Sequence, residues 1–149
     1  MKTTTHQITN DWVALWNGDL SMTDRIIAAD FISHAAPLTG GAPDDTVGPN
    51  ALTNWVRAIH TILRNLRFTV QLGPFHDADM VVLRWHATGT YIGGIPNAAA
   101  LTGTPATFYG TDTLRLDDDQ HIAEYWANAD SLWFAQQLGI SIPVSVRPH

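Results

Sequence analysis

The feature that most constrains the fold is a change of hydrophobic period after Asn65. Before that point apolar residues recur at helical spacing, as do Leu52, Val56 and Ile59. Beyond it apolar and polar residues alternate, which is typical of half-buried strands. Helices followed by strands along one chain predict an α+β fold, in which the helices pack on a sheet.

The same patterns predict the individual elements. Helices are expected over residues 8–17, over 25–29 and from Pro49 onward, with a long loop over 34–49. Strands are expected over residues 67–72, 80–91, 107–116 and 122–128, followed by a closing helix over 130–138 that Asp130 caps. A strongly bent antiparallel sheet wrapped around the helices would leave a cone with an apolar interior. The length of 149 residues suits a single domain, 1–149.

Composition excludes several classes of protein. The chain has no cysteine, which removes disulfides, zinc–thiolate sites and cysteine nucleophiles. Eight scattered Lys and Arg against 14 Asp and Glu give a net charge of −6, so we expect no nucleic-acid partner. No apolar run reaches membrane-spanning length, and the N-terminal segment lacks the apolar stretch of a signal peptide. We therefore expect a cytoplasmic protein without a membrane span.

Metal and nucleotide sites are not expected either. The histidines and carboxylates do not cluster at ligand spacing, and the pair His121 and Glu124 is placed on opposite faces of a strand. No glycine-rich phosphate loop is present. We therefore expect neither a metal nor another cofactor, and any chemistry falls to carboxylates, imidazoles and phenols.

Asp112 is the strongest candidate for a catalytic residue. In the strand predicted over 107–116, alternation places Asp112 on the same face as Phe108 and Leu114. Burial on that apolar face would raise the pKa of the carboxyl toward the range useful for a general acid or base. The alternative is a structural Asp that accepts hydrogen bonds from its neighbours.

Two further residues are candidates for catalysis. His34 ends an apolar stretch and opens the long loop, from which it would reach the mouth of the cone. Asp130 directly follows the last strand, although helix capping explains an Asp at that position equally well. The residues expected to bind substrate share an aromatic or polar side chain near the apolar interior: Trp55, Trp85, Tyr91, Phe108, Tyr125 and Asn128.

Several segments together resemble the SnoaL-like polyketide cyclase, or ester cyclase, family of the nuclear transport factor 2-like superfamily. They are Phe31-Ile32-Ser33-His34, the strand segments 84–91 and 110–116, the segment 122–126, and Gln137-Leu138-Gly139. The resemblance extends over most of the chain. It implies a pocket for a hydrophobic small molecule, a homodimer formed across the sheet, and cofactor-free proton transfer that closes a ring by aldol addition.

The family's catalytic pair maps onto two changed positions. Counting back from Gln137-Leu138-Gly139, the family's carboxylate falls at Ala127 and its histidine at Asp112. The acid is therefore missing from the last strand, and an acid is present on the neighbouring one. The resemblance then implies a cyclase, or a related lyase or isomerase, in which Asp112 is the acid or base and His34 and Tyr125 orient the enolate oxygen.

Two other functions stay open on the sequence. A non-catalytic protein that binds a hydrophobic small molecule would explain why Ala127 replaces the family's carboxylate. An epoxide-hydrolase-type enzyme on the same scaffold would need Arg84 in the cavity, where the alternation of the strand does not place it.

Overall fold

The computed structural model describes residues 4–141. Four helices pack on one six-stranded sheet, which confirms the α+β class. The helices are α1 Thr5–Trp16, α2 Met22–Ile26, α3 Pro49–Ile62 and α4 Ser131–Gln137. The strands are β1 Ile27–Ala35, β2 Asp44–Val47, β3 Leu63–Asp77, β4 Met80–Tyr91, β5 Pro105–Leu116 and β6 Ile122–Ala129.

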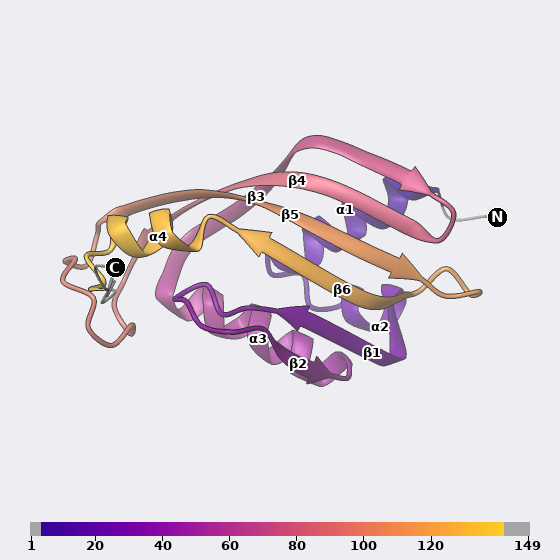
Figure 1. Ribbon diagram of the computed structural model, residues 1–149, viewed down its shortest axis with the longest axis horizontal. Helices are drawn as coiled ribbons and strands as arrows, with labels where there is room; N and C mark the ends of the chain where they lie inside the picture. Colours follow the sequence, from indigo (N-terminus) through magenta and orange to yellow (C-terminus); the bar gives the residue numbers. More distant parts are fainter. Residues whose placement is uncertain (1–3, 142–149) are drawn as a thin grey trace, which may run out of the picture.

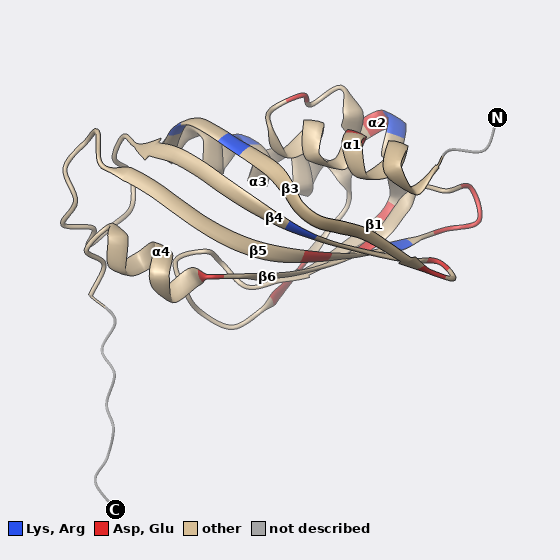
Figure 2. Ribbon diagram, turned by 90° about the horizontal axis from the view of Figure 1, so that it is seen from above, with Lys and Arg blue, Asp and Glu red and all other residues tan. Residues whose placement is uncertain are grey.

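The strands follow the order β2-β1-β6-β5-β4-β3, and the sheet curls without closing (Figure 1). β3 to β6 form consecutive antiparallel pairs, as the alternation predicts. β1 joins β6 in parallel and carries β2 on its outer edge, so the sheet is mixed rather than wholly antiparallel. Figure 2 shows α1, α2 and α3 together on one side of the sheet.

The N-terminal part differs most from the sequence-based expectation. Where a helix was predicted over 25–29, α2 ends at Ile26 and β1 begins at Ile27. The expected loop over 34–49 contains the short edge strand β2. The sequence pattern does not predict β1, because the buried Ser33 interrupts the apolar residues on its inward face. Its main partner, β6, is also distant in sequence.

The C-terminal elements follow the prediction closely, with one exception. Asp130 is the N-cap residue of α4, but its side chain makes no capping hydrogen bond. Instead Asp130 Oδ2 accepts a hydrogen bond of 3.3 Å from the backbone N–H of Tyr109. The side chain therefore joins the end of β6 to β5 rather than capping the helix.

Polar contacts hold α1 against its neighbours. Asn17, at the end of α1, donates its side-chain amide to the carbonyl of Phe68 at 3.1 Å and accepts from the N–H of Phe68 at 2.7 Å. His60 of α3 lies 2.7 Å from the carbonyl of Trp16, to which its Nε2 donates. These contacts fix the inward faces of α1 and α3 opposite the sheet.

The apolar core lies between these helices and the sheet. The largest fully buried side chains include Trp12, Leu15, Phe31, Leu52, Leu83, Phe108 and Leu114.

Candidate functional site

A cavity of about 150 Å³ lies between α1, α3 and the inner face of the sheet. Its walls are mainly aromatic: Trp12, Trp16, Trp55, Phe68, Trp85, Phe108 and Tyr125. Asn128 and Ser131, near the start of α4, add neutral polar groups. Among the lining residues in the described part of the chain, Asp112 is the only carboxylate. The cavity therefore combines an apolar wall with one acid–base group.

The alternation of β5 brings Asp112 inside, as the sequence predicts. Its side chain is 3% exposed. The Trp12 indole Nε1 donates a hydrogen bond of 2.9 Å to Oδ2, and the Tyr125 hydroxyl donates one of 3.1 Å to Oδ1. The carboxylate is thus held by one donor from α1 and one from β6. The Trp12 contact, which joins residues 100 apart in sequence, was not predicted.

The surroundings of Asp112 tune its acidity. Burial raises the pKa of the Asp112 carboxyl from 3.8 to about 6, and the nearby donor groups of Trp12, Trp85 and Tyr125 act in the opposite direction. Burial also raises the pKa of the Tyr125 phenol well above 10, and the charge of Asp112 adds to this shift. At neutral pH Tyr125 therefore stays protonated as a donor, while Asp112 titrates close to the working range of a general base.

Gly110 makes room for one wall of the cavity. It pairs with Trp85 across β4 and β5, and a Cβ atom at position 110 would lie 2.1 Å from Cζ2 of that indole. The Trp85 ring is further held edge-on by Phe68, at 5.0 Å between centroids, and by Phe108, at 5.6 Å. Gly110 is therefore required for the close approach of the indole to β5, on the same strand face as Asp112.

Trp16 offers an unused hydrogen-bond donor in the same wall. Within residues 4–141, its buried indole Nε1 has no hydrogen-bond partner. The ring lies among other residues that line the cavity, 5.0 Å from Trp55 and 5.9 Å from both Trp12 and Phe68 between centroids. A buried donor without a partner is costly in a folded protein unless a ligand satisfies it.

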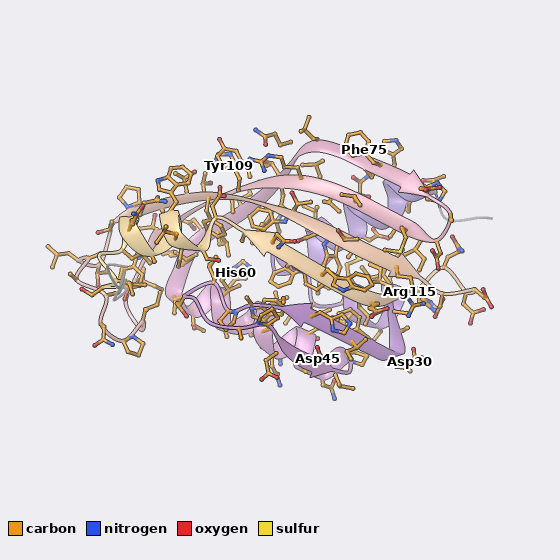
Figure 3. The ribbon with its side chains drawn as sticks, in the orientation of Figure 1. Asp30, Asp45, His60, Phe75, Tyr109 and Arg115 are labelled. Atoms are coloured by element: carbon orange, nitrogen blue, oxygen red, sulfur yellow. The ribbon has the colours of Figure 1, made fainter. Side chains whose placement is uncertain are left out.

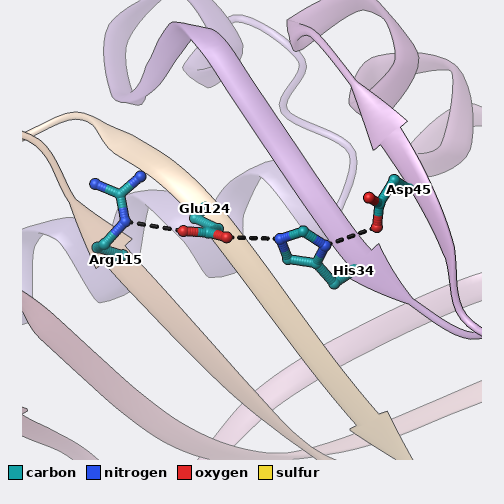
Figure 4. A network of polar contacts seen from close by, with 4 residues as sticks. All are labelled: His34, Asp45, Arg115 and Glu124. Carbon is teal, nitrogen blue, oxygen red and sulfur yellow. Dashed lines mark hydrogen bonds and ion pairs between the residues drawn. The ribbon is translucent and has the colours of Figure 1, made fainter.

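His34 lies on the outer face of the sheet, away from the cavity. Its Nδ1 lies 2.7 Å from Asp45 and its Nε2 2.6 Å from Glu124, which in turn accepts from Arg115 at 2.9 Å (Figure 4). Asp45 and Glu124 raise the pKa of His34, and Arg115, followed by His34, lowers the pKa of Glu124. This network joins four neighbouring strands, β2, β1, β6 and β5. The expectation that His34 reaches the mouth of the cone is wrong, because the register of β1 turns it outward.

The other predicted site residues divide into two groups. Trp55, Trp85, Phe108, Tyr125 and Asn128 line the cavity, as expected. Tyr91 does not line it: the ring is buried at the far end of β4, where its hydroxyl accepts from the N–H of Ile95 at 3.2 Å. Asp130 is exposed and bonds to β5, so it lies outside the lining as well.

Trp12, Trp16 and Phe68 also line the cavity, although the sequence does not single them out as cavity residues. The helical spacing of Trp12 and Trp16 predicts that they point inward, and that was the available signal. Spacing alone does not separate a packed core residue from a cavity wall.

The outer face of the sheet carries Arg84 and an aromatic group. Arg84 Nε donates to Gln71 at 2.7 Å, and its guanidinium lies 4.9 Å from the centroid of the Tyr109 ring. Tyr109, labelled in Figure 3, stacks on His86 and on the partly exposed Trp133. An epoxide-hydrolase-type enzyme would need Arg84 inside the cavity. Arg84 lies on the outer face of the sheet instead, which argues against that function. The homodimer across the sheet stays a prediction.

One group in the described part of the chain brings three potential metal ligands together, at the β5–β6 turn. Side-chain ligand atoms of Asp117, Asp119 and His121 lie within 4.8 Å of one another. Asp117 Oδ1 already accepts hydrogen bonds from the N–H groups of Asp119 and His121, both at 2.9 Å. This arrangement is that of a hydrogen-bonded turn, and it lies apart from the residues that line the cavity.

No helix in residues 4–141 is long and apolar enough to cross a membrane.

The curled sheet, its covering helices and the internal cavity define a cone of the nuclear transport factor 2-like fold. The family described as SnoaL-like polyketide cyclase matches residues 6–138. The chain therefore belongs to the SnoaL-like polyketide cyclase family, which supports a cyclase-type function and a small-molecule substrate.

Solved structures share this fold at low sequence identity. IdmH, a putative polyketide cyclase from Streptomyces antibioticus, is 22% identical with a TM-score of 0.75, over 92% of this chain and 99% of that one. AclR, a putative hydroxylase from Streptomyces galilaeus, is 19% identical with a TM-score of 0.75, over 95% and 88%. A putative polyketide cyclase from Acidithiobacillus ferrooxidans is 22% identical with a TM-score of 0.75, over 93% and 97%. No curated protein matches the sequence.

Proposed function

We propose that this protein is a cofactor-independent cyclase that acts on a hydrophobic carbonyl compound and uses Asp112 as its general base. One observation carries the proposal: a buried carboxyl with a pKa of about 6 lies in the wall of an aromatic cavity. Enzymes shift the pKa of a carboxylic acid in this direction when it must take up and return a proton near neutral pH.

The proposed reaction is an intramolecular aldol addition. The Asp112 carboxylate removes a proton from the carbon next to a carbonyl group, and the electron pair moves onto the carbonyl oxygen as an enolate. The enolate carbon then attacks a second carbonyl of the same molecule, which forms the new carbon–carbon bond. The resulting alkoxide takes the proton back from Asp112, so the step balances without an oxidant, a reductant or a cofactor.

The surrounding donors suit this cycle. Trp12 and Tyr125 hold both oxygens of the carboxylate through hydrogen bonds, and Tyr125 keeps its proton at neutral pH. Trp16 adds a further indole to this wall, and its buried Nε1 has no hydrogen-bond partner within residues 4–141. Preorganised donors aimed at developing negative charge are among the larger contributions to catalysis.

The register between β5 and β6 supports a relocated base. Asp112 and Ala127 are direct Cα partners across the two strands, and both line the cavity. The position to which the resemblance assigns the family's carboxylate is therefore directly opposite Asp112. Moving the acid by one strand keeps it in the same cavity, while the alanine opposite adds space beside it.

The second candidate function is a protein that binds a hydrophobic small molecule without reacting with it. Ala127 favours it, because the acid that the resemblance implies on the last strand is missing. Both functions use the aromatic cavity, and they differ in whether Asp112 removes a proton from the bound molecule.

Proton abstraction from a bound ketone tests the proposal and separates the two functions. We expect the protein to accelerate incorporation of deuterium from D₂O at the α-carbon of 2-tetralone, an apolar bicyclic ketone, followed by NMR. The rate should saturate with ketone concentration. Saturable binding of 2-tetralone with exchange at the buffer rate would contradict the cyclase proposal and favour the binding protein.

A further inference from the structure

His34 connects three strands of the sheet through its two ring nitrogens. Nδ1 lies 2.7 Å from Asp45 Oδ1 on β2, and Nε2 lies 2.6 Å from Glu124 Oε2 on β6 (Figure 4). We call these two contacts the His34 bridge. An ionised carboxylate only accepts hydrogen bonds, and a neutral imidazole has a single N–H group. Both contacts therefore exist together only when the ring carries two protons and a positive charge.

The two carboxylates of the bridge are not held equally. Glu124 also accepts a hydrogen bond of 2.9 Å from Arg115, and its side chain is 22% exposed. Asp45 is 60% exposed and makes no other side-chain hydrogen bond or ion pair within residues 4–141. When the ring loses one proton, the remaining N–H stays on the better held Glu124, and a nitrogen lone pair faces Asp45. The bridge therefore breaks on the side of β2.

Little else holds β2 at this position. Among the described strands, β2 pairs only with β1. The N–H of Gly48 donates to the carbonyl of Phe31 at 2.8 Å, and hydrogen-bonded pairs alternate along an antiparallel ladder. His34 and Asp45 are register partners three steps farther along, so they form a non-hydrogen-bonded pair. The side-chain contact is therefore the direct link between these two residues.

The His34 bridge lies next to a loop that lines the inner cavity. This loop joins β1 to β2 and contains Ala36 and Leu38, both of which belong to the cavity lining. The parallel pairing of β1 with β6 runs up to Ser33 and Tyr125, one residue before His34. The bridge therefore holds the β1–β2 hairpin at the point where its loop leaves the sheet to cover the cavity.

We propose that protonated His34 holds the β1–β2 hairpin against β6, and that loss of one proton releases β2 and loosens the loop over the cavity. The bridge is then a pH-sensitive element that controls how tightly the cavity encloses a small molecule. This role is separate from catalysis, because it depends on contacts of the outer face and not on proton transfer by Asp112.

The charges around the ring set the direction of the pH dependence. They come from Asp45 on β2, Glu124 on β6 and, behind Glu124, Arg115 on β5; Asp30 of β1 itself acts on Arg115. Asp45 and Glu124 raise the pKa of His34. The bridge therefore stabilises the hairpin below the ordinary pKa of histidine, and this contribution is lost as pH rises through the raised value.

Hydrogen exchange of backbone amides in the full chain, followed by NMR between pH 6 and pH 9, tests the proposal. Each rate is divided by the intrinsic exchange rate at the same pH. The reporter is the Gly48 N–H, and its reference is the Tyr91 N–H, which donates to the carbonyl of Thr104 at 2.8 Å. We expect protection of Gly48 to fall about two- to fivefold as the His34 ring titrates, the range of an exposed ion pair, and that of Tyr91 to change less.

Two substitutions separate the charge from the contact. The amide of Asp45→Asn accepts from the charged ring and donates to the neutral one, so protection of Gly48 should no longer depend on pH. His34→Val removes the bridge but suits a strand, and protection should be low at every pH. His86→Val is the matched control and should behave as the wild type, since the half-buried His86 lies 2.6 Å from the neutral hydroxyl of Thr107.

Equilibrium dialysis measures the effect on the cavity. The probe is acetophenone, an apolar ketone with a single ring. Between pH 6 and pH 9 its affinity for the wild type should fall about twofold or more relative to its affinity for Asp45→Asn. The comparison cancels the titration of Asp112, because both proteins carry this carboxyl.

Protection of Gly48 that does not change with pH in the wild type, or that falls equally in Asp45→Asn, would overturn the proposal. So would an equal fall at Tyr91, or a constant ratio of the two acetophenone affinities. These outcomes are distinct from a failure of the proposed function, because amide exchange and dialysis need no proton transfer by Asp112.

Discussion

The Asp112→Asn variant is expected to lose about 10²- to 10⁴-fold in the rate of α-proton exchange, the range that a single general base contributes. Asparagine keeps the size of the side chain and can still accept the Trp12 hydrogen bond, but it cannot take up the proton. Binding of acetophenone should persist, since the aromatic walls are unchanged. The NMR exchange assay and equilibrium dialysis measure the two effects separately.

Stability provides the internal check on this variant. The pKa of Asp112 is higher in the folded protein than its ordinary value of 3.8, so the folded state binds the proton more tightly than the unfolded state. Stability therefore falls as pH rises from about 4 to about 6, and above that range the buried carboxylate costs of the order of 3 kcal/mol. Asp112→Asn should unfold at the same or a higher temperature than wild type at pH 8. A purely structural role would not explain Asp112, because its ionised carboxylate lowers the stability of the folded protein.

Asp130→Asn is the matched control, because Asp130 is an exposed carboxyl outside the cavity lining. Its exchange rate should stay near that of the wild type. Unchanged turnover in Asp112→Asn, with loss in Asp130→Asn, would remove Asp112 from the mechanism.

The Ala127→Asp variant should split the acid limb of the pH–rate profile into two steps, with the second about one unit or more above the limb of the wild type. The new carboxyl lies directly opposite Asp112, inside the same apolar cavity. Two carboxylates in such surroundings repel each other, so one of them ionises only at higher pH. The wild type, with a single carboxyl in the cavity, should show one step only.

Ala127→Asn separates charge from size in this experiment. It adds nearly the same volume without a second acid, and its acid limb should stay where the wild type has it. If the limbs of Ala127→Asp and Ala127→Asn coincide, the titrating group is not Asp112. Exchange activity that appears only in Ala127→Asp would favour a wild-type protein that binds without catalysis.

Local alternation was enough to predict the central residue of the site. Phe108, Asp112 and Leu114 share the inner face of β5 because side chains in a strand alternate strictly, and no tertiary information is needed. The stripe Leu52, Val56 and Ile59 likewise placed α3 against the sheet. These are short-range patterns with one physical period, and the structure confirms them.

Positions that depend on pairing between distant segments were not predictable in this way. His34 points outward because β1 pairs with β6, and the sequence of β1 shows no clear period around the buried Ser33. One of the two donors to Asp112 is Trp12, on a helix 100 residues away. Tyr91 has an inward aromatic side chain, but its distance from the cavity depends on its place along β4.

The most direct test of the central claim is the pH dependence of kcat/KM for α-proton exchange in the wild-type protein. Asp112 must be ionised to accept the proton, so kcat/KM should rise with pH and level off above an apparent pKa of about 6. That limb should be absent from the residual activity of Asp112→Asn. A profile that is flat between pH 5 and pH 8, or a limb that persists unchanged in Asp112→Asn, would contradict Asp112 as the general base.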